Sequence, residues 1–379
     1  MKTTINIIRV LVGILFIFSG LVKAIDPLGL SYKMQEFFEL WKMSQFNDYT
    51  LWLSILIIAF EIIAGVALLL GWRMKLFSWL LLLLIIFFTF LTGYAYLSGK
   101  FKNCGCFGDC IPITSYTSFV KDIILLVLII VLFAFKNKIK PLLVEGLSIL
   151  VMLLVTMGSF WLQFYVLKHL PVIDCLPYKV GNNISEKRKI PAGALSDSFS
   201  IRFIYEKAGK EYEFSPSELP ADLGTYTYKN RIDKLIRKGN AEPPIKGFSL
   251  SGITEIDSTD IILEMPYSIL LFDHASKNKK NDWENKFQEI RIEAVKKNIP
   301  VYIVTISVEE YINNTKTDLP VFKCDFTAIR TAARANPTIY LLKKGTVEGK
   351  WGYADFDKAK TGIEKISNQQ PTTSNPLSQ

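Results

Sequence analysis

The first 170 residues consist of long apolar runs separated by short polar connections, whereas the rest of the 379-residue chain mixes polar and apolar positions throughout. The runs cover residues 6–23, 51–71, 74–97, 119–135 and 142–168. Each is about as long as the ~20 residues that a helix needs to cross a bilayer. No small-residue cleavage site follows the first run, so we interpret it as a membrane span rather than a signal peptide. The pattern predicts a membrane half and, from residue 176 onward, a soluble half.

Segment 32–46 lies between the first two runs and mixes aromatic and aliphatic residues with charged ones. It is too polar to span a membrane and too apolar to remain in water, which is typical of a helix in the membrane interface. We therefore expect a helix that lies on the membrane rather than through it.

Two connections, residues 71–75 and 136–141, are short and basic and contain no acidic residue. By the positive-inside rule both face the cytoplasm. With five spans, the N-terminus is then cytoplasmic, and the connection between the third and fourth spans lies outside, as does everything after Lys168. All five cysteines of the chain therefore lie on the oxidising face of the membrane, where disulfides form and persist.

Three of these cysteines fall within seven positions, in the loop Asn103-Cys104-Gly105-Cys106-Phe107-Gly108-Asp109-Cys110. Thiols this dense beside a membrane indicate exchange chemistry or metal binding more than packing. A Cys-x-Cys pair can form a small disulfide that oxidises other thiols readily when a glycine lets the backbone bend, and Gly105 meets that need. Cys110 could then resolve a mixed disulfide or pair with Cys175.

Two other interpretations of the cysteines compete with exchange. The spacing Cys-x-Cys-x3-Cys is not a common zinc-knuckle spacing and lacks a second ligand pair, so we expect no metal site. The second interpretation, a purely structural disulfide in an outer loop, remains an alternative. The net charge of +9 does not indicate nucleic-acid binding either, because the basic residues are scattered.

Glu61 lies near the middle of the second span, where an ionised carboxylate is costly unless it is paired or protonated. Its nearest candidate partner by depth is Lys23, at the outer end of the first span. The pair either has a function, in binding a proton or the head group of a quinone, or only fixes the packing of the two helices.

The residues resemble the DoxX/MauE-type membrane proteins, the latter named for methylamine utilisation, over roughly residues 1–135. The resemblance rests on Ser19-Gly20 with Lys23, on Glu61 with Gly65, and on Cys104-Gly105-Cys106-Phe107-Gly108-Asp109. It implies a four-helix membrane bundle, similar in outline to the vitamin K epoxide reductase-like disulfide formers. It also implies a part in the redox maturation of exported proteins, with Cys104 and Cys106 as the redox pair and a quinone or another membrane carrier as electron acceptor. The fifth span and the soluble tail depart from the family pattern.

The soluble half opens with two alternating segments around Ala208-Gly209-Lys210, within residues 200–214, which predict a β-hairpin. A helix is expected over Lys229–Lys238, and Pro243-Pro244 then breaks regular structure. Beyond the break, strands and helices alternate over residues 267–272, 282–297, 301–306, 327–335 and 338–343. This alternation predicts an α/β sheet with crossover helices.

The last strand and the residues before it resemble thioredoxin, which places a cis-proline before its fourth strand, and Pro337 is the corresponding residue. The thioredoxin dithiol is absent, because residues 273–280 read DHASKNKK. This domain is therefore not expected to exchange disulfides by itself. We interpret Cys324 as a small buried hydrophobe and His274 as a surface residue. The edge beside the cis-proline can still hold an extended peptide of a client protein.

We thus expect an α-helical membrane bundle, with a four-helix DoxX/MauE-like core and a fifth transmembrane helix, joined to an α/β thioredoxin-like domain. The expected division is 1–140 for the four-helix domain, 141–170 for the fifth helix, 176–260 for an extracytoplasmic lead-in with a hairpin, 261–366 for the thioredoxin-like domain and 367–379 for a disordered tail.

The leading functional hypothesis is an inner-membrane thiol–disulfide redox component that supports disulfide formation in exported proteins, with the thioredoxin-like domain docking a partner. If the chain is an enzyme, it is a membrane thiol–disulfide oxidoreductase that uses Cys104, Cys106, Cys110 and Cys175. The alternative is a non-enzymatic membrane scaffold whose cysteines are structural. A transporter is disfavoured, because no paired spans broken by Gly or Pro are present.

Overall fold

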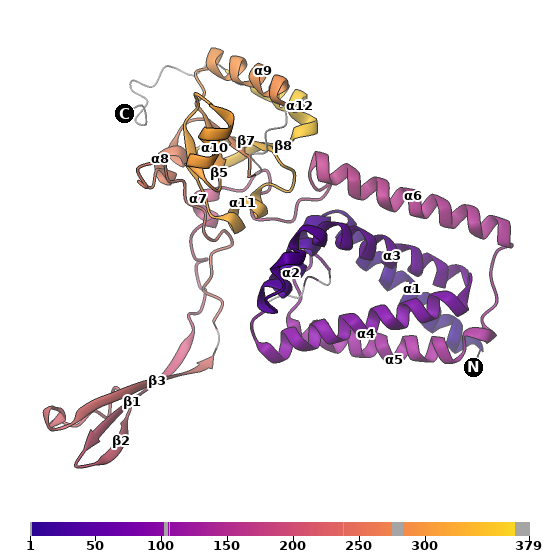
Figure 1. Cartoon of the computed structure of the whole chain (residues 1–379), viewed down its shortest axis with the longest axis horizontal. Coiled ribbons are helices and arrows are strands. Elements are labelled where there is room, and N and C mark those ends of the chain that lie inside the picture. The colour runs from indigo at the N-terminus through magenta and orange to yellow at the C-terminus, as the bar shows by residue number, and fades with distance from the viewer. Residues whose placement is uncertain (1, 102–104, 106, 238, 275–282, 368–379) are drawn as a thin grey trace.

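The computed structural model describes residues 2–101, 105, 107–237, 239–274 and 283–367. It consists of a bundle of long helices, an α/β domain at one end of that bundle, and a narrow three-stranded arm that projects from the α/β domain (Figure 1). The expected C-terminal disordered tail lies almost wholly outside the described residues.

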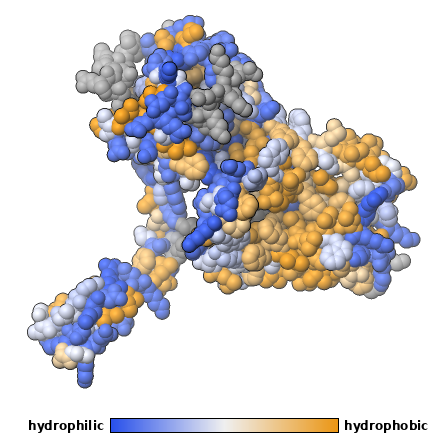
Figure 2. Space-filling view, in the orientation of Figure 1, coloured by the Kyte–Doolittle hydropathy of each residue, from blue (hydrophilic) through white to orange (hydrophobic). Residues whose placement is uncertain are grey.

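Among the described residues, five helices are long and apolar enough to cross a membrane, which confirms a multi-pass membrane protein. They are α1 (Lys2–Ala24), α3 (Thr50–Leu70), α4 (Met74–Ser98), α5 (Ser115–Ala134) and α6 (Glu145–His169). Their outward surface is predominantly apolar, whereas the α/β domain and the arm are largely polar (Figure 2). The sequence pattern predicted all five within a few residues, because the run of apolar residues sets the length of a span.

Helices α1 and α3 approach closely because glycines lie where they cross. A Cβ atom built on Gly65 would lie 2.8 Å from the carbonyl oxygen of Gly13, and one built on Gly20 would lie 2.6 Å from Ile62. Small residues at a crossing bring two membrane helices into backbone contact. This close packing sets the depth at which side chains of α1 meet those of α3.

The helix predicted over 32–46 is present but begins and ends earlier, as α2 (Pro27–Leu40), followed by the 3-10 helix η1 (Ser44–Tyr49). Asp26 caps the N-terminus of α2, since its carboxylate accepts a hydrogen bond from the Gly29 N–H at 3.2 Å, and Pro27 suits the first helical position. The sequence interpretation overlooked this cap. Helix α2 buries Leu30, Met34 and Phe37 against the bundle, as an interfacial helix should.

The two basic connections lie at the same end of the bundle. The Leu142 N–H donates to the Leu70 carbonyl at 2.9 Å, and the short 3-10 helix η2 (Lys136–Lys138) lies in the second connection. The described part of the cysteine loop lies at the other end, beside α2, where a Cβ on Gly105 would lie 3.0 Å from Lys33 Cγ. The ends of the bundle therefore differ in the way that the expected topology requires.

The α/β domain has a five-stranded sheet of order β6-β5-β4-β7-β8. Strands β4, β5 and β6 are parallel, whereas β7 pairs antiparallel with β4 and with β8. The Asn336–Pro337 bond before β7 is cis, which confirms the prediction for Pro337. This is the expected thioredoxin-like arrangement. The strands are β4 (Ser268–Phe272), β5 (Val301–Thr305), β6 (Val321–Lys323), β7 (Thr338–Lys343) and β8 (Thr346–Gly352).

Helices cover both faces of this sheet and bury a core on each. The helices are α7 (Ile184–Lys187), α8 (Thr259–Glu264), α9 (Trp283–Lys296), α10 (Val308–Thr315), α11 (Phe326–Ala332), η4 (Tyr353–Asp355) and α12 (Phe356–Glu364). The sequence interpretation placed Cys324 at the end of a strand, which is β6, but missed α10, whose eight residues are fewer than a helix usually needs to be recognised from its pattern. One core includes Tyr178, Ile184 and Phe248, so the segment expected as a lead-in contributes to this domain.

The arm is a three-stranded antiparallel sheet of order β2-β1-β3, with β1 (Ser198–Lys207), β2 (Lys210–Phe214) and β3 (Thr227–Arg237); the 3-10 helix η3 (Leu223–Thr225) precedes β3. The predicted hairpin is confirmed. The helix predicted over Lys229–Lys238 is wrong, because β3 pairs with β1 along nearly its whole length. Charges spaced four residues apart, at Lys229, Asp233 and Arg237, resemble one face of a helix. A short helix exposed to water is only marginally stable, however, whereas pairing with β1 provides hydrogen-bond partners for the backbone of this segment.

Candidate functional site

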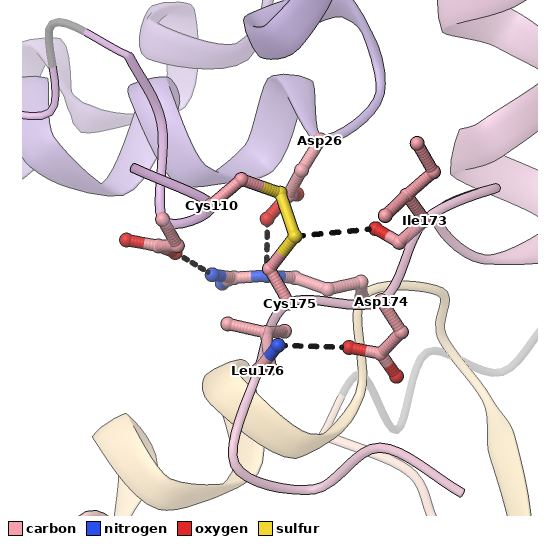
Figure 3. The surroundings of a disulfide bond; sticks show 8 residues. Asp26, Cys110, Ile173, Asp174, Cys175 and Leu176 are labelled. Carbon is pink, nitrogen blue, oxygen red and sulfur yellow. Dashed lines mark hydrogen bonds and ion pairs between the residues drawn. A yellow bond between two sulfur atoms is a disulfide. The ribbon is translucent and has the colours of Figure 1, made fainter. Parts of the chain in front are cut away.

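A disulfide between Cys110 and Cys175 lies at the end of the bundle that carries the α/β domain (Figure 3). Cys110 ends the cysteine loop and Cys175 follows α6, and their Cα atoms are 4.9 Å apart. Of the two roles considered for Cys110, the structure contains the pairing with Cys175. Cys104 and Cys106 lie outside the described residues, so their redox pairing stays a prediction.

The described part of the cysteine loop turns at two glycines. Gly105 has φ +69° and Gly108 has φ +59°, in the left-handed region that residues with a side chain rarely adopt. The Gly108 N–H donates to the Gly105 carbonyl at 3.0 Å, and the Phe107 ring lies 5.9 Å from that of Phe18. These turns direct the chain back over the end of the bundle toward Cys110.

The residue before Cys110 is bound by the α/β domain. Asp109 Oδ2 lies 2.6 Å from a terminal nitrogen of Arg334, and Arg334 Nε lies 2.9 Å from Asp26 Oδ2 (Figure 3). The Arg334 side chain is only 4% exposed. Burial raises the pKa of Asp26, and the two carboxylates hold the pKa of Arg334 above its ordinary value in spite of its burial. Arg334 therefore stays charged and joins both carboxylates to the domain.

The residue before Cys175 is bound in the same way. Lys350 Nζ lies 2.9 Å from Asp174 Oδ2, and Lys350 is 3% exposed. The other oxygen of Asp174 accepts the Leu176 N–H at 3.0 Å (Figure 3). Burial lowers the pKa of Lys350, although Asp174 opposes that shift. Each cysteine of the disulfide thus follows an aspartate that is paired with a buried cation of the α/β domain.

Further contacts join the domain to the bundle. The Arg330 guanidinium lies 3.6 Å from the centre of the Tyr32 ring and donates to Gln35, and His169 Nδ1 lies 2.8 Å from Asp355 Oδ2. Arg330 and Arg334 belong to the segment that leads to the cis-proline. Part of the region expected to hold a client peptide therefore contacts the membrane half of the same chain.

Inside the bundle, Lys23 and Glu61 form the expected ion pair, and their side chains are 3% and 1% exposed. Ser19 donates to the second carboxylate oxygen of Glu61 at 3.1 Å. The Lys23 ammonium also lies 5.2 Å from the centre of the Phe88 ring. The glycines between α1 and α3 explain how Lys23 reaches the middle of the neighbouring helix.

The Lys23–Glu61 pair lines a small, largely apolar cavity of about 60 Å³, part of it open to the outside. A second carboxylate, Asp122 of α5, lines the same cavity and is 1% exposed. It accepts a hydrogen bond from Thr92 at 3.0 Å and pairs with Lys121 at 2.8 Å. Gly105 also lines this cavity, so the cysteine loop borders it.

The remaining two candidates do not join this site. Cys324 is 2% exposed, and burial raises the pKa of its thiol to about 12, which confirms a buried and unreactive sulfur. His274 was expected on the surface, but its side chain is half-buried. Burial lowers its pKa, and its backbone N–H donates to Asn336 at 3.0 Å beside the cis-proline.

The sequence interpretation missed the charged residues that surround the disulfide, namely Asp26, Asp109, Asp174, Arg334 and Lys350. One signal was available, because the dipeptide Asp-Cys occurs at both 109–110 and 174–175. Nothing in the pattern identified their partners, which lie more than a hundred residues away in the chain. Asp122 was also missed, although a charge inside an apolar run is a functional signal by default.

Comparison with known proteins finds matches to the membrane half and to the arm. Residues 1–135 match the family model described as methylamine utilisation protein MauE, and residues 199–238 match a domain of unknown function, DUF8463. Protein TlpB of Flavobacterium psychrophilum is 31% identical over 134 residues, which are 35% of this chain and 36% of that protein. The match therefore spans little more than a third of this relative. The MauE resemblance is confirmed over residues 1–135; the DoxX label is not supported by these matches.

A structural comparison found a solved structure of the bacterioferritin comigratory protein of Xanthomonas campestris, which was studied for alkyl peroxide reduction. It is 14% identical and covers 31% of this chain and 88% of that chain, with a TM-score of 0.25. A similarity this low supports no functional argument. The thioredoxin-like description of the domain depends instead on its strand order and its cis-proline.

Proposed function

We propose that this chain is a membrane thiol–disulfide oxidoreductase that oxidises thiols of exported proteins. The observation that carries the proposal is the disulfide between Cys110 and Cys175, which joins the cysteine loop to the segment after α6 at one end of the bundle. A sulfur pair at that position, next to a loop with two more cysteines, provides the parts of a two-step relay. The match of residues 1–135 to the MauE family model supports a membrane redox role.

In the proposed reaction, a thiolate of a client protein attacks one sulfur of a disulfide of this chain and forms a mixed disulfide. The second client thiolate then attacks the client sulfur of that bond, so the client gains a disulfide and this chain gains two thiols. Cys104 and Cys106 are the proposed pair that exchanges with the client, and Cys110 and Cys175 are the second pair, which passes the two electrons and two protons on toward the electron acceptor. The thioredoxin-like domain docks the client beside these sulfurs.

The cavity inside the bundle suits the electron acceptor that this reaction needs. Its walls are apolar, and its few polar groups form two clusters, one at Lys23 and Glu61 and one at Thr92 and Asp122. Apolar pockets with a few oriented polar groups are typical of sites for small cofactors. A quinone bound there would accept the two electrons and two protons. Lys23 would donate a hydrogen bond to one of its carbonyl oxygens, and Asp122 would accept one from a hydroxyl of the reduced form, while the aromatic and aliphatic walls would exclude water.

We further propose that the cysteine end of the bundle faces the periplasm of a bacterial inner membrane. The two basic connections lie together at the opposite end, which supports a cytoplasmic N-terminus. A reporter that is active only in the periplasm should be active when fused after Lys168 and silent when fused at Lys138. The reverse result would place the cysteines in a reducing compartment and remove the basis of the proposed reaction.

The direct test traps the mixed disulfide. A Cys106→Ala variant lacks the thiol that could attack a mixed disulfide on Cys104 and return the client in its reduced form, so covalent complexes that dissociate on reduction should accumulate in intact cells. Cys324→Ala is the matched control, because that thiol is buried and unreactive, and it should trap nothing. Equal amounts of client on both variants, or none on either, would reject the exchange role.

One observation favours the rival function, a scaffold with structural cysteines. The disulfide links the cysteine loop to the segment that leads from α6 to the thioredoxin-like domain, and ion pairs with buried cations of that domain lie beside both cysteines, as in a structural staple. In that case thiol labelling in growing cells should find Cys110 and Cys175 permanently oxidised. Cycling between the two states supports exchange.

A further inference from the structure

The two halves of the disulfide share a local design that the exchange reaction alone does not require. Cys110 follows Asp109, and Cys175 follows Asp174. Each aspartate is paired with a cation of the thioredoxin-like domain, Arg334 at 2.6 Å and Lys350 at 2.9 Å. The two cations are 4% and 3% exposed, so both pairs are shielded from water on the domain side.

The cations occupy fixed places in the domain. Lys350 lies in strand β8 and its ammonium lies 5.4 Å from the centre of the Tyr340 ring, on the neighbouring strand β7. Arg334 precedes the cis-proline and donates to the Arg330 carbonyl at 3.0 Å. Because the folded domain already orders both side chains, binding an aspartate costs little further conformational entropy. The domain is thus a rigid template with two anion-binding positions.

The segments that carry the two cysteines have no short covalent connection. They are 65 residues apart in sequence, and helices α5 and α6 lie between them. When the disulfide is reduced, noncovalent contacts alone keep the two sulfurs adjacent. Among the described residues, the Asp109–Arg334 and Asp174–Lys350 pairs are the ion pairs closest in sequence to the two cysteines.

We propose that Arg334 and Lys350 are positioning residues that keep Cys110 and Cys175 adjacent in the reduced state. The inference rests on the proposed function, since it matters only if this disulfide is opened and closed. In this role the thioredoxin-like domain, which lacks its own dithiol, aligns the dithiol of the membrane half. Its cations replace the short covalent connection that a Cys-x-x-Cys motif provides.

The proposal predicts the sign of a measurable equilibrium. In a glutathione buffer, the disulfide and two glutathione thiols exchange with two protein thiols and one glutathione disulfide, so atoms and electrons balance. The equilibrium constant for closure is proportional to the effective concentration of one protein thiol near the other. Removing a positioning cation lowers that concentration and makes the disulfide easier to reduce. If the cations instead only stabilised thiolates, their removal would make it harder to reduce.

The experiment uses the full chain in detergent micelles, in a background with Cys104→Ser, Cys106→Ser and Cys324→Ala. The protein is equilibrated in glutathione buffers of stepped composition, and the free thiols are counted by a maleimide that shifts the gel band. Arg334→Met and Lys350→Met should each lower the closure constant about tenfold, which is a rise in reduction potential of about 30 mV. Arg334→Lys should recover part of the loss. His169→Gln removes another contact between the bundle and the domain, the one to Asp355, and should leave the constant unchanged.

Asp109→Asn and Asp174→Asn guard against variants that fail to fold, because each breaks the ion pair next to its cysteine and leaves the cations of the domain in place. Each should lower the closure constant as its cation partner does, and the double variant Asp109→Asn/Arg334→Met should shift no further than Arg334→Met alone. Unchanged constants, constants that rise, or an equal shift in His169→Gln would overturn the proposal. The background lacks Cys104 and Cys106, so these constants do not depend on turnover. If they shift as expected while no client is trapped on Cys106→Ala, the proposed function fails and the positioning role does not.

Discussion

The ion pair between Lys23 and Glu61 provides the sharpest test of how the membrane half is held together. Lys23→Met removes the cation and leaves the Glu61 carboxylate, 1% exposed, with the Ser19 hydroxyl at 3.1 Å. Breaking a buried pair on one side costs about 3–5 kcal/mol, because the remaining charge is uncompensated. Glu61→Met leaves the ammonium in the same position, next to the Phe88 ring. We expect each single variant to lose about that amount of stability.

The double variant Lys23→Met/Glu61→Met should behave differently. Replacing both charges with apolar side chains of similar length removes both the attraction between the charges and the cost of burying them. Such double replacements often leave the stability unchanged. We therefore expect the double variant to lie within about 1 kcal/mol of the natural chain. The coupling energy of the cycle would then be several kcal/mol, well above the values of about 0.5–3 kcal/mol usual for residues in contact.

The assay is reversible unfolding in mixed micelles by titration with SDS, followed by the change in helix content. Gly146→Ala is a suitable control, since a Cβ there meets nothing within 4 Å. If the single variants lose less than about 1 kcal/mol, or the double variant loses as much as their sum, the buried charges are not paired in the membrane and the reasoning is refuted. The double variant also separates two roles of the pair. A stable double variant that no longer cycles its cysteines would show that the pair acts on the electron acceptor as well as on packing.

Four further predictions concern the soluble side. Cys324 should resist maleimide at pH 8 in the folded chain and react after unfolding, since burial raises its pKa to about 12. Gly352→Ala should weaken docking of the domain and expose α2 to hydrogen exchange, because its Cβ would lie 2.5 Å from the Lys168 carbonyl oxygen. Burial raises the pKa of Asp26 above 3.8, so folding takes up a proton between the two pKa values. Compared with Asp26→Asn, the natural chain should therefore gain free energy of unfolding as the pH falls toward 3.8, which chemical denaturation at stepped pH would measure. Deletion of residues 198–237 should leave the melting temperature of the domain unchanged, because neither core of the domain contains an arm side chain.

The prediction from sequence was most accurate where one property of a segment decides its structure. A run of some 20 apolar residues spans a bilayer regardless of its neighbours, so all five spans were predicted. A short segment has no such independence. Strand β3 was mistaken for a helix because its charges repeat every four residues, and only the partner strand β1 decides the outcome. The start of α2 was misplaced for a related reason, since the cap at Asp26 was not considered.

For the candidate site, the cysteines and the Lys23–Glu61 pair were named from the sequence because their residue types are rare in such surroundings. Arg334 and Lys350 were not, because the chain has 44 basic residues and these two carry no local mark. Their importance comes from burial against Asp109 and Asp174, which are far away in the chain.

The sequence by itself determined that the chain is a multi-span membrane protein with a loop dense in cysteines and a thioredoxin-like domain without its dithiol, because length, apolarity and residue type are local properties. Only the tertiary structure decided that Cys110 pairs with Cys175, that the loop borders a cavity with two carboxylates, and that the domain binds both aspartates beside the disulfide. Those outcomes depend on which distant groups share a small volume of low polarity, where an ion pair is strong and an unpaired charge is costly. No short window of sequence contains that information.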